Sequence, residues 1–423
     1  MEFSQLSREQ LRTLQTSLNE QYEAFRRANL NLDLTRGKPA PAQLDLSNAL
    51  DGILEGFYLL QDGTDVRNYG GLLGIPEARQ LAATFLEVDV NEVMVGGNSS
   101  LTLMFAYIDH MMPIWRQELA NNPTAKIKFL CPVPGYDRHF TICEHFDIEM
   151  INIPMLEGGP DMDLVESLLR QDPLIKGIWC VPKYSNPTGH TYSDEVVDRF
   201  ARLAEIAGEH FIILWDNAYT VHHLSDHPDV LKNLMWEAKR QGNARSVVVL
   251  GSTSKVTFAG AGIAFLAAAP DQLKAFEKYL SASVIGFDKV NQLRHVRFLQ
   301  DAEHIAEHMV KHRTIIQPKF DLTQKILTEH LAGKGIARWS QPQGGYFISL
   351  DTLPGLASEV IRQAAAIGVK LTPAGATFPY GIDPKDSNIR IAPTFPAMDS
   401  LQRALEVFVV CLQLATVNQL LSD

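Results

Sequence analysis

The sequence predicts an α/β protein with two parts, a large domain on a mostly parallel seven-stranded sheet and a smaller α+β domain. Between residues 126 and 267, apolar strand-like runs alternate with helical segments, which is typical of a parallel sheet covered on both faces. After residue 344, shorter strands and helices indicate a second domain. We place the large domain at residues 47–304 and the discontinuous small domain at residues 1–46 and 305–423.

The individual elements follow from periodicity and end signals. Ser7 and Gln10 have capping-box spacing at the start of an amphipathic helix over residues 7–29. Pro76 predicts a helix start, and another helix is expected at residues 101–112. The strands expected in the large domain are 93–95, 126–131, 148–153, 175–182, 210–216, 246–251 and 262–268. The small domain should contain strands at 344–350, 369–371 and 388–392, with helices at 355–367 and from about 398.

Composition narrows the class of protein. The chain has 423 residues, 46% of them hydrophobic, which suffices for two cores. Its net charge is −11 and no Lys/Arg block stands out, so neither nucleic acid nor a membrane surface is an expected partner. No signal peptide or membrane-length apolar run is apparent, which predicts a soluble, cytoplasmic protein. The four cysteines are far apart in apolar settings and are expected to be reduced core residues.

One lysine occupies an unusual place. The apolar run from Val247 to Gly251 reads as a buried strand, and Lys255 follows it directly. Burial there would disfavour the charged ammonium and leave an amine able to attack a carbonyl group. The alternative is an exposed loop lysine between helix-capping serines.

Other polar side chains also follow predicted strands. Asn186 lies in Tyr184–Gly189, Asp216 and Tyr219 follow the strand at 210–216, and Tyr136 follows the strand at 126–131. Ligands of such sheets bind at the carboxyl ends of the strands. Each residue alone is more often a cap or a turn former, but together with Lys255 they predict one crevice.

Two glycine-containing loops and one buried arginine add candidates. Asn98, Ser99 and Ser100 follow Gly96-Gly97 at a helix start, where free N–H groups suit a phosphate, although they could be simple caps. Gly37 lies in the loop Leu32–Pro39, which is otherwise an ordinary turn. Arg390 lies mid-strand among apolar residues, so it should meet a carboxylate of either a ligand or an internal ion pair.

The histidines carry a weaker signal. His304, His308 and His312 have four-residue spacing on a helix expected near 288–312, which is compatible with a metal site. We favour a solvated helix face and predict no metal, because no residue that would activate or orient these imidazoles is identifiable. His222-His223 is taken as structural.

These motifs together resemble the fold-type I, pyridoxal-phosphate-dependent class I aminotransferases, most closely the MocR-like branch that contains bacterial aspartate aminotransferases. The resemblance covers nearly the whole chain. The motifs that carry it are Leu32-x-Leu34-x-x-Gly37-x-Pro39, Ser185-Asn186-Pro187-Thr188-Gly189, Asp216-x-Ala218-Tyr219, Ser252-x-Ser254-Lys255 and Asn388-x-Arg390.

The resemblance implies a role for each matching residue. Lys255 would attach pyridoxal 5′-phosphate covalently and move a proton as the free amine. Asp216 would pair with the pyridine nitrogen, and Asn186 and Tyr219 with the phenolic oxygen. Arg390 would clamp the substrate carboxylate, with Gly37 and Asn186 beside the substrate. The phosphate would be held by Asn98, Ser99, Ser100, Ser252 and Ser254, and by Tyr69 from a neighbouring subunit of a homodimer.

Two departures from the family pattern stand out. The arginine that usually follows the lysine and binds the phosphate is replaced near Gly262. The aromatic residue that usually stacks on the cofactor ring falls at Val133, so either Val133 packs there or Tyr136 substitutes.

The expected activity is amino transfer between L-aspartate and 2-oxoglutarate by a ping-pong mechanism. The cation for the second carboxylate is chosen from Arg36, Lys38, Arg138, Lys289 and Arg294, and we favour Arg36 because it adjoins Gly37. Alternatives are another amino-acid substrate, such as alanine or an aromatic one, β-elimination on the same scaffold, and a non-catalytic sensing module.

Overall fold

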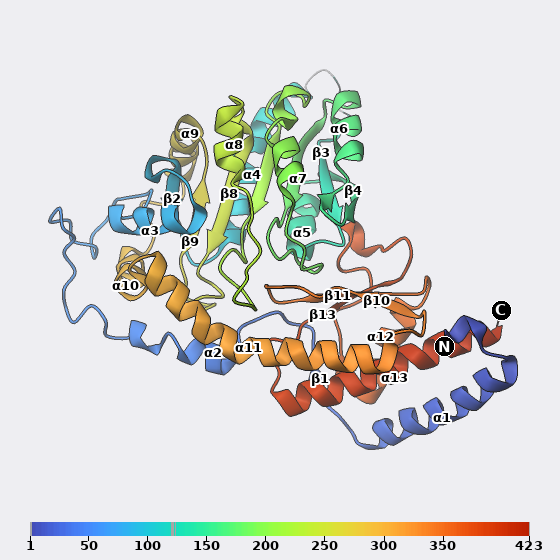
Figure 1. Cartoon of the computed structure of the whole chain (residues 1–423). Coiled ribbons are helices and arrows are strands. Elements are labelled where there is room, and N and C mark those ends of the chain that lie inside the picture. The colour runs from blue at the N-terminus through green and yellow to red at the C-terminus, as the bar shows by residue number, and fades with distance from the viewer. Residues whose placement is uncertain (1, 120–121, 123, 423) are drawn as a thin grey trace.

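The large sheet organises the fold (Figure 1). A computed structural model describes residues 2–119, 122 and 124–422, and in this part of the chain the sheet has eight strands in the order β2-β9-β8-β7-β6-β3-β4-β5. Their bounds are β2 Val93–Val95, β3 Lys128–Val133, β4 Glu149–Leu156, β5 Gly159–Pro160, β6 Ile175–Cys180, β7 Ile212–Asp216, β8 Val247–Ser252 and β9 Ala264–Ala267. β3, β4, β6, β7 and β8 are parallel, while β2, β9 and β5 join antiparallel. The seven predicted strands are present, and β5 is a two-residue eighth.

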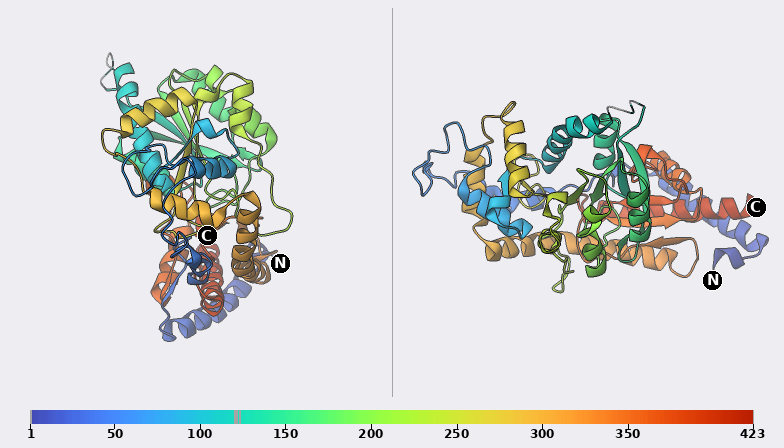
Figure 2. Two further views of the ribbon diagram at one scale, coloured as in Figure 1. Left: turned by 90° about the vertical axis from the view of Figure 1, so that its left-hand side faces the viewer. Right: turned by 90° about the horizontal axis from the view of Figure 1, so that it is seen from above.

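Alternating side chains of the strands build two cores. On β8, Val247 and Val249 contribute to one apolar cluster, whereas Val248 and Leu250 contribute to another. This alternation follows from the two-residue period of a strand and requires helices on both faces, as Figure 2 shows. The helices are α3 Pro76–Leu86, α4 Ser100–Glu118, α5 Asp137–His145, α6 Met162–Gln171, α7 Asp194–Phe200, α8 Leu234–Arg240, α9 Pro270–Leu280 and α10 Lys289–Leu299.

A smaller α+β part lies below the sheet in Figure 1 and contains both termini. Its strands are β10 Ala337–Trp339, β11 Ile348–Thr352 and β13 Asn388–Ile391 in one antiparallel sheet, and the parallel pair β1 Leu32–Asp33 and β12 Val369–Lys370. Its helices are α1 Arg8–Arg27, α2 Pro41–Asp45, α11 Ala302–Leu331, α12 Ala357–Ile367 and α13 Met398–Ser422. The predicted capping box of the N-terminal helix is confirmed at Ser7 and Gln10.

Helix α11 links the two parts. Its first half packs Ile305 and Met309 into a sheet core, and its second half packs Ile316 and Phe320 into the core of the small part. The predicted domain boundary at residues 304/305 falls inside this helix and stays a prediction. The single helix expected near 288–312 is wrong, because the chain breaks between α10 and α11 at Gln300, whose φ is 51°.

The predicted solvated histidine face is also wrong. His304 is exposed, but His308 and His312 are buried. His308 Nε2 lies 2.7 Å from the Val256 carbonyl oxygen and 3.1 Å from His312 Nε2, and Gln43 Nε2 donates to His312 Nδ1 at 3.1 Å. Burial lowers the pKa of His312 to about 4. These histidines therefore tie α11 to the loop after Lys255.

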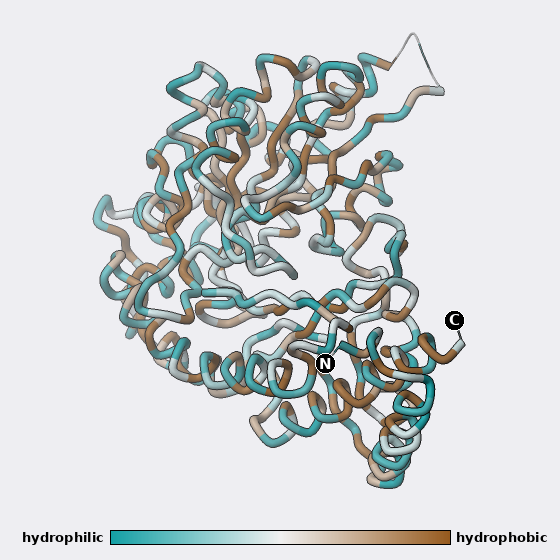
Figure 3. The backbone as a smooth tube through the Cα atoms, turned by 45° about the vertical axis from the view of Figure 1, so that its right-hand side comes forward, coloured by the Kyte–Doolittle hydropathy of each residue, from teal (hydrophilic) through white to brown (hydrophobic). Residues whose placement is uncertain are grey.

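One helix is long and apolar enough to cross a membrane by length and composition, contrary to the expectation that no such run exists. This helix is α13, and 72% of its most apolar window is buried inside the protein. It packs against α1, α11 and α12, which accounts for its apolar character. Figure 3 shows apolar stretches along the inner segments of both parts of the fold. All four cysteines are buried and free, as expected.

Candidate active site

The carboxyl ends of β6, β7 and β8 bring the predicted polar residues together between the large sheet and the small part. Asp216 is the last residue of β7 and is paired in register with Leu250 of β8. Asp216 and Asn186 are 2% and 3% exposed, and Tyr219 is equally buried. The strand-end rule thus located one site, because parallel strands end at the same edge.

Asp216 has one partnered and one free carboxylate oxygen. Its Oδ2 lies 3.1 Å from His139 Nε2, and the His139 ring stacks on Trp179 with centroids 4.3 Å apart and planes 9° apart. Its Oδ1 is buried without a hydrogen-bond partner. A buried carboxylate oxygen without a partner is costly and is suited to pair with a protonated pyridine nitrogen. The site therefore fits the cofactor that the sequence implied.

Lys255 is half-buried, and its amine lies near Tyr219. Lys255 Nζ is 4.9 Å from the centroid of the Tyr219 ring. Burial lowers the pKa of Lys255, and the charge of Asp216 opposes this effect. The Lys255 carbonyl oxygen lies 3.3 Å from His222 Nε2 and accepts from the Tyr346 hydroxyl at 3.5 Å. The backbone at Lys255 is therefore fixed, and burial shifts its amine toward the neutral form that reacts with carbonyls.

The predicted phosphate cradle is assembled from two loops. Ser252 Oγ donates to Ser254 Oγ at 3.1 Å, and Ser254 Oγ donates to the Asn98 carbonyl oxygen at 3.2 Å. Ser99 is the N-cap residue of α4, yet its side chain makes no capping hydrogen bond, and Ser100 is the first helical residue. Hydroxyls beside the free N–H groups of a helix start form an anion site. The simple-cap alternative does not hold for Ser99.

The absence of an arginine at Gly262 has a steric reason. A Cβ atom at Gly262 would lie 2.8 Å from Thr253 Oγ1 and 3.2 Å from the Ser254 nitrogen. Any side chain there would push against the serine loop. Asn291 Nδ2 instead donates to the Gly262 carbonyl oxygen at 3.0 Å and holds the turn. The close packing of Gly262 therefore shapes the cradle.

Arg390 lies on β13 and is 8% exposed. Its Nη1 donates to Asp137 Oδ1 at 3.2 Å and to Asn186 Oδ1 at 3.3 Å. Its Nε is buried without a partner. The internal ion pair is therefore present, and donor capacity remains for a ligand carboxylate, whose binding by Arg390 stays a prediction.

Gly37 belongs to the Arg390 side of the site. A Cβ atom at Gly37 would lie 2.1 Å from Phe347 Cζ, and the Phe347 ring lies 5.0 Å from the Arg390 guanidinium carbon. Arg36 beside it is exposed, as is Arg138. The positive charge of Arg138 lies close enough to the Tyr136 hydroxyl to lower its pKa, although burial dominates and raises it. The charge of Arg36 instead contributes to lowering the pKa of Asp33.

Of the other candidate cations, two are already engaged. Lys289 is 5% exposed and donates to the carbonyl oxygens of Tyr69 and Gly70 at 3.1 and 2.7 Å. Lys38 lies 4.0 Å from the ring centroid of Phe395. Arg294 is half-buried on α10. Lys289 therefore fixes the loop that presents Tyr69, whose side chain is 85% exposed.

Tyr136 and Val133 lie in different surroundings. Val133 is 8% exposed and packs into a sheet core. The Tyr136 ring lies edge-on to His139 at 5.0 Å, and burial together with the charge of Asp216 raises the pKa of its hydroxyl. Tyr136, like Trp179, therefore adjoins Asp216 through His139.

Sequence reasoning missed His139, Asp137 and Phe347. His139 lies on the first turn of α5, three residues after Tyr136. Its position in the helix that begins directly after the β3 loop could have placed it near the strand ends. Asp137 begins the same helix. Phe347 precedes β11 and reaches Arg390 only through space.

The fold and this site define a fold-type I aminotransferase that uses pyridoxal 5′-phosphate. The chain belongs to the aspartate amino-transferase family, whose model matches residues 6–423. It is similar to a putative aminotransferase of Mycolicibacterium smegmatis, with 44% identity over 100% of both chains. It is also similar to an aspartate aminotransferase of Corynebacterium glutamicum, with 42% identity over 95% of this chain and 93% of that one. The crystal structure of an aspartate transaminase from Corynebacterium glutamicum has a TM-score of 0.95 and 40% identity, covering 99% of each chain.

The protein is a transaminase whose substrates are an amino acid and a 2-oxo acid. When bound, the cofactor supplies a carbonyl group that reacts with amines and a ring that accepts electrons. The protein residues would bind and orient the reactants. Lys255 would hold the cofactor, Asp216 its ring nitrogen, the Ser252–Ser254 loop its phosphate, and Arg390 the substrate carboxylate.

Proposed function

We propose that this transaminase moves the amino group of L-aspartate to 2-oxoglutarate in two successive half-reactions. The observation that carries the proposal is Arg390, a buried guanidinium whose Nη1 donates to Asn186 and whose Nε has no partner. Such a group suits the α-carboxylate common to both substrates. The preference for dicarboxylates is supported by the Corynebacterium glutamicum relative, which is named an aspartate aminotransferase.

The proposed proton transfers centre on Lys255. Its amine, whose pKa is lowered by burial, would take the proton from the substrate Cα and deliver it to the C4′ carbon of the cofactor. Asp216, held by His139, would direct its free carboxylate oxygen to the ring nitrogen and so favour the protonated ring. Arg390 would align the Cα–H bond with Lys255 by fixing the α-carboxylate.

The experiment is a steady-state series with 2-oxoglutarate and a panel of amino donors. Parallel double-reciprocal plots and the highest kcat/KM for aspartate would support the proposal. A highest kcat/KM for alanine or an aromatic amino acid would contradict the substrate assignment and leave the transaminase chemistry intact.

A second test concerns the cation for the side-chain carboxylate. Arg36→Ala should lower kcat/KM for aspartate by about 10- to 100-fold and leave alanine nearly unchanged, since a charge-assisted hydrogen bond contributes about 1.5–3 kcal/mol. Arg138→Ala is the matched variant, because Arg138 is also exposed and its charge reaches Tyr136. Equal losses on aspartate and alanine would remove Arg36 from this role, and a selective loss only in Arg138→Ala would transfer the role to Arg138.

We also propose a homodimer in which Tyr69 reaches the phosphate of the neighbouring subunit. Large apolar side chains are exposed on the same segment, with Phe57 at 70% and Leu59 at 59%, and such a patch is typical of an interface. Light scattering should report two chains per particle, and Tyr69→Phe should weaken cofactor binding. A monomer that is fully active would contradict this assembly.

A further inference from the structure

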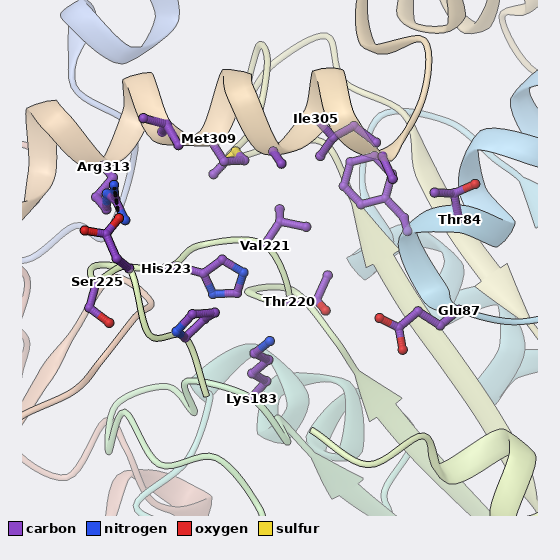
Figure 4. Close-up of a pocket in the computed structure, with 16 residues that line it drawn as sticks. Thr84, Glu87, Lys183, Thr220, Val221, His223, Ser225, Ile305, Met309 and Arg313 are labelled. Carbon is purple, nitrogen blue, oxygen red and sulfur yellow. Dashed lines mark ion pairs between the residues drawn. The ribbon is translucent and has the colours of Figure 1, made fainter. Parts of the chain in front are cut away.

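A cavity of about 400 Å³ lies beside the candidate active site, between α11 and the loops that follow β6 and β7 (Figure 4). Its lining includes Lys183, which precedes the Tyr184–Gly189 loop, and Thr220 and Val221, which follow Tyr219. A second hollow of about 250 Å³ adjoins it and also contains Lys183. The cavity thus shares its walls with the two loops that carry Asn186 and Tyr219, but neither residue lines it.

Lys183 is the first sign of a ligand. Its side chain is 8% exposed and points into the cavity toward Thr220 and His223. Within the described residues, its ammonium has no hydrogen-bond acceptor and no carboxylate at ion-pair distance, and its nearest aromatic neighbour is the Tyr184 ring at 5.4 Å. Burying an ammonium without a partner is costly, so an anion in the cavity would stabilise it.

An acid lies across the same space. The Glu87 carboxylate belongs to an exposed residue and points into the cavity in Figure 4, and its charge acts on Lys183 more strongly than that of Asp229 in the adjoining hollow. Among the described residues no side chain donates to this carboxylate, although the Glu87 backbone carbonyl accepts from Asn233 and Trp236 at 2.7 and 2.9 Å. The two other charged residues of the lining, Arg313 and Asp226, form an ion pair with a nitrogen–oxygen distance of 2.7 Å. Lys183 and Glu87 are therefore the charges left for a ligand.

The third wall is apolar. Ile305, Met309 and Val310 of α11 line the cavity together with Phe85 of α3 and Val221. In Figure 4, Ile305 and Met309 project from α11 toward the side of the cavity that holds Lys183. A ligand of complementary chemistry has an anionic group, a cationic group and an apolar body.

We propose that this cavity binds an L-α-amino acid with an apolar side chain, with its carboxylate at Lys183, its ammonium at Glu87 and its side chain against α11. The volume lies in the range of about 300–1,000 Å³ that small-ligand sites occupy. The site is separate from Arg390 and does not depend on the proposed substrate.

Such a ligand is placed to influence catalysis. Tyr184, next to Lys183, packs its ring so closely on Gly344 that a Cβ atom there would lie 2.2 Å from it. Its hydroxyl lies 2.8 Å from His223 Nδ1 and accepts from the Asp229 nitrogen at 3.2 Å. A molecule bound at Lys183 would therefore adjoin the tightly packed loop that contains both Tyr184 and Asn186.

The test is calorimetric titration of the borohydride-reduced holoenzyme with L-leucine. Reduction fixes the cofactor on Lys255, so leucine cannot react at the active site. We expect saturable binding of one leucine per chain. 4-Methylpentanoate lacks the ammonium group of leucine, and 3-methylbutylamine lacks its carboxylate. Each should bind at least about tenfold more weakly than leucine, because hydrogen bonds to charged groups contribute about 1.5–3 kcal/mol.

Two variants locate the binding. Lys183→Met should weaken leucine binding about tenfold or more by the same reasoning, and Ala306→Trp should abolish it by filling the cavity from α11. The control is Lys325→Met, which removes a 68% exposed lysine from the same helix and should bind leucine normally. No binding by the reduced enzyme, unchanged binding in Ala306→Trp, or equal binding of 4-methylpentanoate would overturn the proposal.

Discussion

Replacing Arg390 by methionine tests the substrate clamp in isolation. Methionine approximates the apolar stem of arginine but removes the charge and all of its donors. The surroundings can tolerate the change, because the Asp137 side chain is 36% exposed and water can solvate it once the ion pair is lost. The global fold should therefore persist, with a small change in Tm.

The expected loss of activity is large. Removing one member of a buried, hydrogen-bonded charge pair costs about 2–5 kcal/mol, which corresponds to about a 30- to 4,000-fold fall in kcat/KM. The fall should be similar for the amino acid and the oxo acid, because both present the same α-carboxylate. Binding of the cofactor should be nearly unchanged, since the residues expected to hold it are elsewhere.

The assay measures kcat/KM for aspartate and for 2-oxoglutarate in single half-reactions, with the cofactor absorbance as the signal. Arg338→Met is the matched control, because Arg338 is an exposed arginine on β10 of the same sheet. A folded Arg390→Met enzyme with less than about a threefold change, against the several kcal/mol expected for a buried pair, would refute the clamp.

Two further predictions concern packing and pH. Gly262→Ala should lower cofactor affinity about 5- to 150-fold, since overpacking costs about 1–3 kcal/mol, while Gly260→Ala, which has open space around it, should not, as a fluorescence titration can measure. Unaffected affinity in Gly262→Ala would count against the cradle. His312 has a pKa of about 4 instead of 6.5, so the unfolded state binds more protons between these values. The contribution of this histidine to the free energy of unfolding is fully present above pH 6.5. Its protonation alone should lower the free energy of unfolding by about 3 kcal/mol at pH 4. His312→Gln should therefore show a shallower fall of unfolding free energy over that window, and an identical slope would contradict the burial argument.

Much of the fold followed from the sequence because its sheet is buried on both faces. Continuous apolar runs such as Val247–Leu250 can be recognised without knowing their partners. The short strands β5 and β10 escaped, because Gly-Pro and Ala-Arg-Trp are not continuous apolar runs. The break at Gln300 escaped because helical periodicity continues on both sides of it, and only the positive φ reveals it.

The site was predictable where chain order dictates position. Asp216 and Lys255 follow parallel strands, so their meeting is a consequence of topology. The partners from distant elements were not predictable. A solvated face was expected for His312 because the sequence identified no partner for it, yet Gln43, 269 residues away along the chain, supplies its hydrogen bond.

The most direct test of the central claim is reduction of the purified protein with borohydride, followed by peptide mass spectrometry. The account predicts a visible absorbance band that disappears on reduction and a phosphopyridoxyl group on the peptide that contains Lys255. No visible band, or a label on another buried lysine such as Lys183 or Lys289, would contradict it.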